Sequence, residues 1–457
     1  MFLDDTIAAI ATPIGEGGLA VIRISGPQAF AVADECFAPA GKLSLKPSAA
    51  QTHTIQYGHV VRNGNTVDEV LVAVMRAPRT FTREDAVEIT CHGGILPAKM
   101  VLDAVLEHGA RLAEPGEFTR RAFLNGRIDL AQAEAVADLI HSRTELALRA
   151  ANEQLAGKLS QRINELRDEM MKTLAHVEAH IDFPEEDIAP DTKDELIGRL
   201  LRGVAFMDDL LRTANEGQIL RHGIRAAIIG RPNAGKSSLL NLLLGHDRAI
   251  VSPIPGTTRD TIEETANIRG LPVVFIDTAG LREARDEIEV EGIRRSRESL
   301  QNAEFILHVF DVSEPFTETD TNYLTEFAGK KRILVRNKID LPSKLPMPSH
   351  LTGPVVEVCC LTGTGIEPLK DAIKDLIWSG EIKTEMLQVM INSRHQDALN
   401  RARVATQRTA DALRANESLE FAAMDLRIAV NAVGEIVGKT TTEDLLDMIF
   451  SQFCIGK

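Results

Sequence analysis

Hydrophobic and polar positions follow different periods in successive parts of the chain. From residue 1 to about 125, short apolar runs such as 19–24 and 67–75 are separated by glycine and proline, which predicts strands joined by turns. From 155 to 181, apolar residues recur every three or four positions, which predicts one long amphipathic helix. This helix should end at Asp182-Phe183-Pro184, because proline disfavours helical geometry in the residue before it. A second helical stripe follows over 196–211.

The pattern changes again near residue 223. Three short apolar runs, 224–229, 273–276 and 333–335, are separated by glycine loops and helical segments. Such alternation is typical of a parallel sheet covered by helices. After Trp378 the helical period returns, and 395–450 contains few turn signals. The pattern predicts one helical domain in two segments with an α/β domain inserted between them, and independent consecutive domains are the alternative.

Composition narrows the classes of function. The 457 residues carry a formal net charge of −15 and only 4% aromatic residues, so any RNA would have to bind through a local basic patch or a partner. The five cysteines form no CxxC pair, which suits a reducing cytoplasm and gives no metal-ligand set. The first residues are acidic, unlike a signal peptide, and no apolar run is long enough to span a membrane. We therefore expect a cytoplasmic protein.

Residues 230–237, Gly-Arg-Pro-Asn-Ala-Gly-Lys-Ser, carry the strongest chemical signal. They fit GxxxxGK[ST] directly after a predicted strand and before an apolar helix over 239–244. Glycines let backbone N–H groups surround phosphate oxygens, and the helix N-terminus favours negative charge. Lys236 is expected to contact the β- and γ-phosphates, and Ser237 to bind Mg²⁺. The other residues of this loop expected to contact the nucleotide are Asn233, Ala234, Gly235 and Ser238.

Three later motifs indicate a guanine nucleotide. The run at 256–260, Gly-Thr-Thr-Arg-Asp, matches a switch loop that would bring a threonine to Mg²⁺ and the γ-phosphate, and Thr258 is the threonine assigned to Mg²⁺. Asp277 is the Walker-B-type acid of a second motif, in which the Gly280 amide would sense the γ-phosphate. Asp340 can accept two hydrogen bonds from guanine, whereas adenine would leave this carboxylate unpaired. The predicted nucleotide contacts in these motifs are Ser252, Pro253, Ile254, Pro255, Gly256, Thr257, Thr258, Asp277, Thr278, Ala279, Gly280, Asn337, Lys338 and Asp340.

Several other features are interpreted as structural. Guanine-binding domains usually carry Ser-Ala-Lys or Ser-Ala-Leu near their end, whereas 359–361 reads Cys-Cys-Leu. Backbone contacts to the base could survive this change, and the cysteines are interpreted as buried small residues rather than a redox pair. Residues 434–440 resemble a second phosphate loop but have the wrong glycine spacing, so a helix end is expected. His92 indicates turn chemistry, and Arg120-Arg121 a solvated face, with a tRNA-facing patch as the alternative.

Together these motifs resemble those of the MnmE (TrmE) family of tRNA-modification GTPases, within the TrmE–Era–septin-like class of P-loop GTPases. The resemblance covers essentially the whole chain. It rests on the loop at 230–237 and on the runs at 5–9, 22–26, 82–85, 91–94, 115–119, 127–130 and 453–457. The final Cys-Ile-Gly-Lys run together with this loop is much more specific than a phosphate loop alone.

The resemblance implies a multidomain α/β and α protein. It would have an N-terminal α+β domain like tetrahydrofolate-binding domains (1–125), a discontinuous helical domain (126–222 and 379–457) and an inserted Ras-like P-loop G domain (223–378). The N-terminal domain would mediate homodimerisation and bind 5-formyl- or 5,10-methylene-tetrahydrofolate. The matching positions are Arg23, Glu88, Arg127 and Lys457. Arg127 replaces a residue that is lysine in some relatives, which keeps the charge but changes the geometry.

The implied activity is GTP hydrolysis coupled to tRNA modification. With the FAD- and NADH-using partner MnmG (GidA), in a heterotetramer or larger complex, such proteins attach an aminomethyl or carboxymethylaminomethyl group to C5 of the wobble uridine of certain tRNAs. A regulatory or assembly switch that uses GTP only to gate a partner is the alternative. The folate-matching residues argue against a pure switch, which has no need of them.

The resemblance also implies that two G domains pair across the nucleotide with a bound K⁺. The cation ligands would be Asn233, Ser252, Ile254 and Thr257. Glu289 would orient the catalytic water through a second water. From the residues alone, Asn233 reads as a turn residue and Glu289 as a solvated helix glutamate. A cation beside the β–γ bridge can neutralise developing charge, as an arginine finger does.

Cys454 has two open interpretations. It is either a small apolar contact or a catalytic thiol that the nearby cation of Lys457 favours as thiolate. A lone cysteine is only a candidate nucleophile until its neighbours are known.

Overall fold

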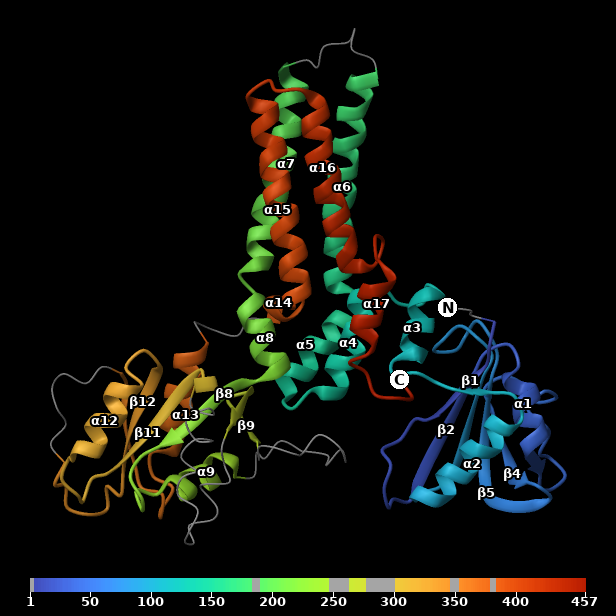
Figure 1. Ribbon diagram of the computed structural model, residues 1–457, viewed down its shortest axis with the longest axis horizontal. Coiled ribbons are helices and arrows are strands. Elements are labelled where there is room, and N and C mark those ends of the chain that lie inside the picture. Colours follow the sequence, from blue (N-terminus) through green and yellow to red (C-terminus); the bar gives the residue numbers. More distant parts are fainter. Residues whose placement is uncertain (1–3, 183–189, 246–262, 277–300, 346–352, 379–383) are drawn as a thin grey trace. The chain divides into compact units, whose positions relative to one another are not determined.

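The computed structural model describes residues 4–182, 190–245, 263–276, 301–345, 353–378 and 384–457 (Figure 1). The chain folds into two compact units, each assembled from separate stretches of sequence. The first unit consists of residues 1–137, 155–200 and 404–457, and the second of residues 138–154 and 201–403. Sequence continuity is therefore a poor guide to which segments pack together. The domain bounds expected from the sequence stay predictions.

A seven-stranded sheet forms the N-terminal part of the first unit, in the order β3-β4-β5-β6-β2-β1-β7 (Figure 1). Its strands are β1 (Ile7–Ile10), β2 (Leu19–Ser25), β3 (Phe37–Pro39), β4 (Thr54–Arg62), β5 (Asn65–Met75), β6 (Ala86–His92) and β7 (Arg111–Leu112). Alternate residues such as Ile22, Val72 and Ile89 point to one face, where they form a core with helices α1 (Ala29–Cys36) and α2 (Ile95–Glu107). The strands predicted near 19–24 and 67–75 are confirmed.

The opposite face of this sheet carries a mixed row of side chains. The register pairs Ile55 with Ala73, Ala73 with Glu88, and Glu88 with Arg23 across four strands. In the adjacent row Tyr57 pairs with Leu71. Ile55, Tyr57 and Leu71 are exposed, so an apolar surface continues directly from the charged pair of β2 and β6.

Helices make up the rest of the first unit, and others belong to the second unit outside its α/β part. They are α3 (Glu117–Leu124), α4 (Leu130–His141), α5 (Glu145–Leu155), α6 (Lys158–Asp182), α7 (Pro190–Leu211), α8 (Ala214–His222), α14 (Thr384–Leu387), α15 (Ser393–Arg414), α16 (Leu419–Val437) and α17 (Glu443–Phe450). The long helix begins later than predicted, because Leu155 ends α5 and Gly157, with φ +82°, separates it from α6. It ends at Asp182, as predicted.

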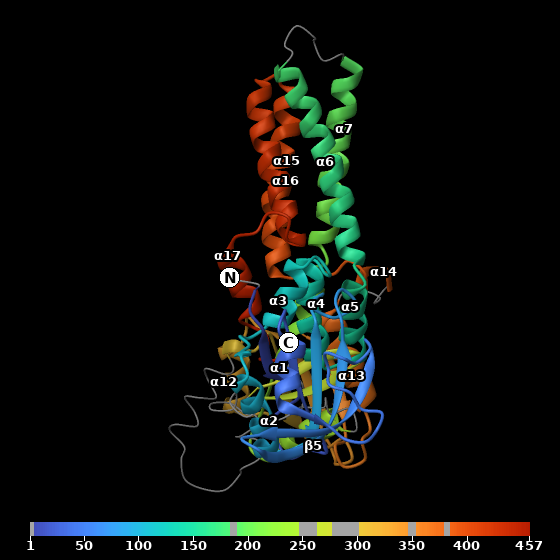
Figure 2. The same ribbon diagram turned by 90° about the vertical axis from the view of Figure 1, so that its right-hand side faces the viewer.

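Helices from before and after the α/β segment pack together in the first unit (Figures 1 and 2). Arg427 of α16, which follows the α/β segment, pairs with Glu178 of α6, which precedes it, at 2.6 Å. The glycine run expected to be a helix end is one: α16 ends at Val437, and Gly438 follows with φ +82°. In the part of the chain that the structure describes, we find no helix with the length and apolar character needed to cross a membrane.

The α/β part of the second unit is a six-stranded sheet in the order β13-β12-β11-β8-β10-β9. Its strands are β8 (Ile224–Ile229), β9 (Glu264–Ile268), β10 (Leu271–Phe275), β11 (Phe305–Asp311), β12 (Lys331–Asn337) and β13 (Val355–Val358), and its helices are α9 (Lys236–Leu244), α12 (Glu318–Glu326) and α13 (Ile366–Ile377). All strand pairs are parallel except β9 with β10. Parallel strands place their carboxyl ends at one edge, where ligands bind in open α/β sheets.

Candidate functional site

The loop at 230–235 joins β8 to α9 at this carboxyl edge. Close backbone approach requires glycine at both its ends: a Cβ on Gly230 would lie 2.3 Å from the Val309 carbonyl oxygen, and one on Gly235 would lie 2.1 Å from Asn337 Nδ2. Asn233 adopts φ +60°, a conformation that asparagine tolerates better than most residues. The predicted phosphate loop therefore has the strand-turn-helix context that it needs, with the α9 N-terminus at its end.

Lys236 folds back across this loop. Its Nζ donates to the carbonyl oxygens of Gly230 at 2.9 Å and Arg231 at 2.8 Å. Burial lowers the pKa of Lys236. Ser237 is partly buried beside it, whereas Asn233 and Ser238 are exposed. The ammonium group thus lies over the ring of backbone groups where phosphate oxygens are expected.

Asn337 joins the phosphate loop to two later motifs. Its Nδ2 donates to the Ala234 carbonyl oxygen at 2.8 Å, and its Oδ1 accepts from the Cys360 N–H at 3.2 Å. The residue is 1% exposed. The structure therefore brings together three motifs that the sequence separates by more than a hundred residues, from Ala234 to Cys360.

Side chains from neighbouring segments contact the predicted guanine-binding motif, residues 337–340. Lys338 pairs with Asp311 Oδ2 at 2.6 Å, and hydrogen bonds from Lys338 and Ser313 overcome the opposing effect of burial and lower the pKa of Asp311. The Cys359 thiol donates to Asp340 Oδ1 at 3.1 Å. Sequence reasoning missed Asp311, although its place at the carboxyl end of a central parallel strand was the available signal.

The two cysteines of the unusual 359–361 run have different surroundings. Cys359 is buried and Cys360 is half-buried, and both are free thiols. Burial raises the pKa of Cys360 to about 11. The interpretation as small buried residues is confirmed for Cys359, and the main-chain N–H of Cys360 keeps a defined place against Asn337.

Arg231 is a second residue that the sequence did not single out. Its guanidinium contacts Glu314 at 3.1 Å and Asp320 at 3.3 Å, and donates to the Pro315 carbonyl at 3.2 Å. The phosphate loop is therefore anchored to the segment before α12 and to the first turn of that helix. No pattern in the sequence pointed to this contact, because its partners lie far along the chain: Pro315 is 84 residues after Arg231.

Other predicted contacts lie outside the described residues. These are Ser252, Pro253, Ile254, Pro255, Gly256, Thr257, Thr258, Asp277, Thr278, Ala279, Gly280 and Glu289. The Mg²⁺, K⁺ and catalytic-water assignments made for them stay predictions.

A second group of charged residues lies on the N-terminal sheet. Arg23 on β2 faces Glu88 on β6 in the strand register, and Arg23 Nε binds Glu88 Oε1 at 2.8 Å. Arg23 also donates to the Gly456 carbonyl at 3.3 Å, and its guanidinium carbon lies 5.6 Å from the Phe118 ring centre. The Phe118 N–H in turn donates to the Lys457 carbonyl at 3.1 Å. Three of the four folate-matching residues are thus gathered around Phe118.

Arg127 reaches this group through another aromatic ring. It donates to the Thr80 carbonyl, and its guanidinium carbon lies 5.2 Å from the centre of Phe81, which packs with Phe118. The Cys454 side chain is exposed. That exposure argues against the interpretation as an apolar contact, and a catalytic role for the thiol stays a prediction.

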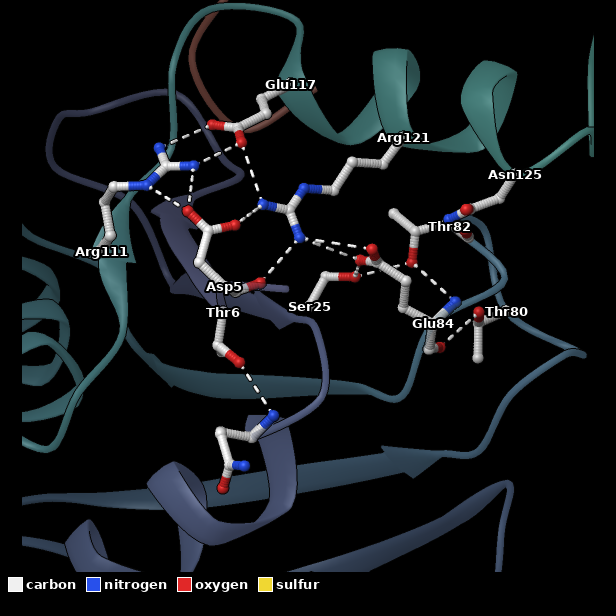
Figure 3. Close-up of polar contacts among 11 residues, drawn as sticks. Asp5, Thr6, Ser25, Thr80, Thr82, Glu84, Arg111, Glu117, Arg121 and Asn125 are labelled. Atoms are coloured by element: carbon white, nitrogen blue, oxygen red, sulfur yellow. Dashed lines mark hydrogen bonds and ion pairs between the residues drawn. The ribbon is translucent and has the colours of Figure 1, made fainter. Parts of the chain in front are cut away.

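The prediction of a solvated arginine pair is wrong. The Arg121 side chain is 0% exposed, and that of Arg120 is 12% exposed and paired with Asp447 of α17. Helix α3 is covered on both sides, and carboxylates from distant segments surround Arg121 (Figure 3). His92 is structural, as interpreted. Its main-chain N–H donates to Asp68 Oδ2 at 2.8 Å, and its ring Nδ1 lies 2.7 Å from Asp68 Oδ1.

Comparison with known proteins places this architecture in one family. Residues 130–454 match the MnmE helical domain, and residues 6–127 match the GTP-binding protein TrmE N-terminus. The tRNA modification GTPase MnmE of Geobacillus kaustophilus is 49% identical over 466 residues, which cover 99% of each chain. The proteins of the same name from Geobacter metallireducens and Bacillus subtilis are 47% and 46% identical, covering at least 99% of both chains. The chain therefore belongs to the MnmE family of tRNA modification GTPases.

Proposed function

We propose that this GTPase is the GTP-hydrolysing subunit of a complex that, with the FAD-dependent partner MnmG, adds an aminomethyl or carboxymethylaminomethyl group to C5 of the wobble uridine in certain tRNAs. One observation favours this chemistry over a pure regulatory switch. Arg23, Glu88 and the Gly456-Lys457 tail meet at one place on the N-terminal sheet, far along the chain from the nucleotide motifs. A switch that only gates a partner has no use for this second polar site.

The second site suits a reduced folate. Such a ligand combines a flat ring system that carries N–H donors with an anionic glutamate tail. The Glu88 carboxylate can accept from the ring donors, Arg23 and Arg127 can bind carboxylates, and Phe81 and Phe118 offer apolar ring faces. The Arg23 and Glu88 side chains are 22% and 31% exposed, so both are accessible to a ligand. Bound there, 5-formyl- or 5,10-methylene-tetrahydrofolate would supply a one-carbon unit.

The G domain holds the phosphates and the base with its own residues. The backbone at 233–237 and the Lys236 ammonium would bind the β- and γ-phosphates, Ser237 and Thr258 would bind Mg²⁺, and Asp340 would select guanine. We further propose that K⁺, held by Asn233, Ser252, Ile254 and Thr257 when two G domains pair, supplies positive charge beside the β–γ bridge. The exposure of Asn233 on the loop supports this proposal. Hydrolysis in K⁺ should exceed hydrolysis in Na⁺, and equal rates would remove Asn233 as a cation ligand.

A homodimer is the oligomer that the N-terminal sheet supports best. The exposed side chains of Ile55, Tyr57 and Leu71 form an apolar surface next to the Arg23–Glu88 row. Burying this surface against a second copy would remove apolar area from water and would place two folate sites near one interface. A monomeric mass in solution across micromolar concentrations would exclude this arrangement.

Wobble nucleosides report directly on the proposed function. A strain that lacks this gene is complemented with the wild type, Glu88→Gln or Glu107→Gln, and its tRNA nucleosides are measured by mass spectrometry. Glu88→Gln should lose the modification, because the amide cannot serve as an anionic acceptor for the ring N–H groups. Glu107→Gln on α2, at the opposite face of the sheet, is the matched control. Full modification in the deletion strain, or with Glu88→Gln, would favour the switch.

A further inference from the structure

Figure 3 shows a network of charged side chains in the N-terminal domain that surrounds one buried arginine. The network borders the proposed folate site without belonging to it, because its loop at 80–85 contacts Arg127 and its helix α3 carries Phe118. Its centre is Arg121 of α3, whose side chain is fully buried. Arg121 binds Asp5 Oδ1 at 2.5 Å, Glu117 Oε1 at 3.1 Å and Glu84 Oε1 at 3.3 Å. It also donates to the Asp5 main-chain carbonyl at 2.9 Å. One guanidinium therefore joins three carboxylates from three separate stretches of the chain.

Stability alone explains such a network poorly. Moving charged groups out of water is costly, and well-packed apolar side chains of similar volume are often as stable or more stable. What a buried arginine provides is geometry: its planar fork fixes the direction and distance of each carboxylate that it binds. The position of Arg121 therefore matters most for what its partners hold.

The first arm of the network fixes the loop at 80–85. Glu84 Oε2 accepts from the Ser25 hydroxyl at 2.7 Å, and this hydroxyl lies 2.6 Å from Thr82 Oγ1. Asn125, just after α3, donates to the Thr82 carbonyl at 2.7 Å. Within the loop, the Thr80 hydroxyl donates to the Glu84 carbonyl at 2.7 Å. Arg121 thus secures this loop through Glu84 to the sheet and to its own helix.

The same loop carries one wall of the proposed site. The Thr80 carbonyl and the Phe81 ring hold the guanidinium of Arg127. A shift of the loop would therefore move Arg127 relative to the sheet.

The second arm fixes the first turn of α3. Glu117 is 0% exposed and accepts from Arg111 at 2.7 Å as well as from Arg121. Hydrogen bonds from Arg111, the Glu114 N–H and Arg121 outweigh burial and lower the pKa of Glu117. The next residue, Phe118, lies under Arg23 and donates its N–H to the Lys457 carbonyl. The second arm therefore fixes the position of Phe118. With the first turn of α3, Phe118 forms the second wall of the site, beside Arg23 and the tail.

We propose that Arg121 is a positioning residue for the N-terminal site: it sets the distance between the loop at 80–85 and the first turn of α3, and hence between Arg127 and the Arg23–tail pair. Arg121 does not touch the ligand itself. The inference rests on the proposed folate function, and it adds a role for a residue that the family resemblance did not assign.

Ligand affinity in the full-length chain tests the proposal. Arg121→Met should raise the Kd for 5-formyl-tetrahydrofolate on the order of ten- to a hundredfold, because displaced side chains lose their alignment with the ligand. Arg121→Lys should recover part of the loss, since a lysine keeps the charge but not the fork. GTP hydrolysis should stay at the wild-type rate. Arg62→Met is the matched control, because Arg62 also binds two carboxylates of the same domain, Asp103 and Glu107, away from both walls.

Hydrogen exchange supplies a readout that needs no ligand. In Arg121→Met, amides of residues 80–85 and 454–457 should exchange faster, whereas those of the β4–β5 hairpin should not change. A folded Arg121→Met that binds folate with wild-type affinity would overturn the proposal. If Arg121→Met does not fold, Arg121→Lys, which keeps the charge but not the fork, takes its place: unchanged affinity and exchange would overturn the proposal.

The two hypotheses can fail separately. If the wild-type chain does not bind the folate, the proposed function fails at this site, and exchange alone then judges the role of Arg121. Faster exchange at both walls would support that role, and unchanged exchange would refute it.

Discussion

Replacing Asn337 by aspartate tests whether the guanine motif holds the phosphate loop in place. The two side chains have the same shape, and the aspartate would still offer an oxygen to the Cys360 N–H. On the other side, the Nδ2 donor that binds the Ala234 carbonyl at 2.8 Å would become a second oxygen. Two oxygens would then face each other in a site where the residue is 1% exposed. The change therefore breaks one contact and leaves the other.

The structure sets the size of the expected effect. A buried acceptor left without its donor costs about 1–3 kcal/mol. Because about 1.4 kcal/mol corresponds to a factor of ten, this cost becomes a rise in Kd of roughly five- to 150-fold for both GTP and GDP. The aspartate side chain has little room to move, because the residue 337 side chain already packs closely against Gly235: a Cβ on this glycine would lie 2.1 Å from Asn337 Nδ2. The carboxylate cannot turn away without displacing the loop.

Equilibrium titration with fluorescent guanine nucleotides measures this change. Asn241→Asp on the exposed side of α9 is the control, because it adds the same charge close to the loop without touching a contact that holds it. Folate binding by Asn337→Asp should match the wild type, which confirms that the rest of the chain is folded. Wild-type affinity in Asn337→Asp would refute the reasoning that this side chain holds the loop.

Three further changes probe other parts of the molecule. Lys236→Ala should remove nucleotide binding, because the phosphates lose the ammonium group that lies over the loop; unchanged GTP affinity in the titration would refute the assignment. His308 is fully buried, and burial together with the nearby charge of Arg332 lowers the pKa of its imidazole to about 3, from 6.5 in the unfolded chain. The unfolded state therefore binds a proton first as the pH drops below 6.5. The free energy of unfolding should fall by about 2 kcal/mol at pH 5. His308→Phe should flatten this fall in urea unfolding of the G domain followed between pH 7 and 5, and equal slopes would contradict the assignment. Deleting residues 454–457 should abolish wobble modification while GTP hydrolysis continues, and modification that persists would exclude the tail from the chemistry.

Local motifs made the nucleotide site readable from the sequence. The loop at 230–237 is bounded by its own strand and helix, and the neighbour that requires Gly230 is the backbone of the adjacent parallel strand, at Val309. Asp340 is set by the strand directly before it. The partners that complete the site were harder to predict from the sequence, because Asp311 and Glu314 come from another strand and the loop after it. Their identity depends on strand order, which periodicity alone does not determine.

The N-terminal site shows the opposite case. Arg23 and Glu88 are 65 residues apart and meet only because β2 and β6 are paired in one particular register. Their grouping was inferred from family resemblance, since nothing in the local pattern of either strand indicates it. A shift of one residue in this register would send one of the two side chains to the other face of the sheet. The site therefore depends on tertiary structure in a way that the phosphate loop does not.

Arg121 was misread for a related physical reason. Two adjacent arginines on a short helix are normally solvated, because an unpaired charge is expensive to bury. That expectation reverses when distant segments supply enough carboxylates, as Asp5, Glu84 and Glu117 do here. The exception is informative because burying a charge demands several well-oriented partners. A buried arginine whose partners lie in the two walls of a site is therefore better explained by the geometry of that site than by the stability of the domain.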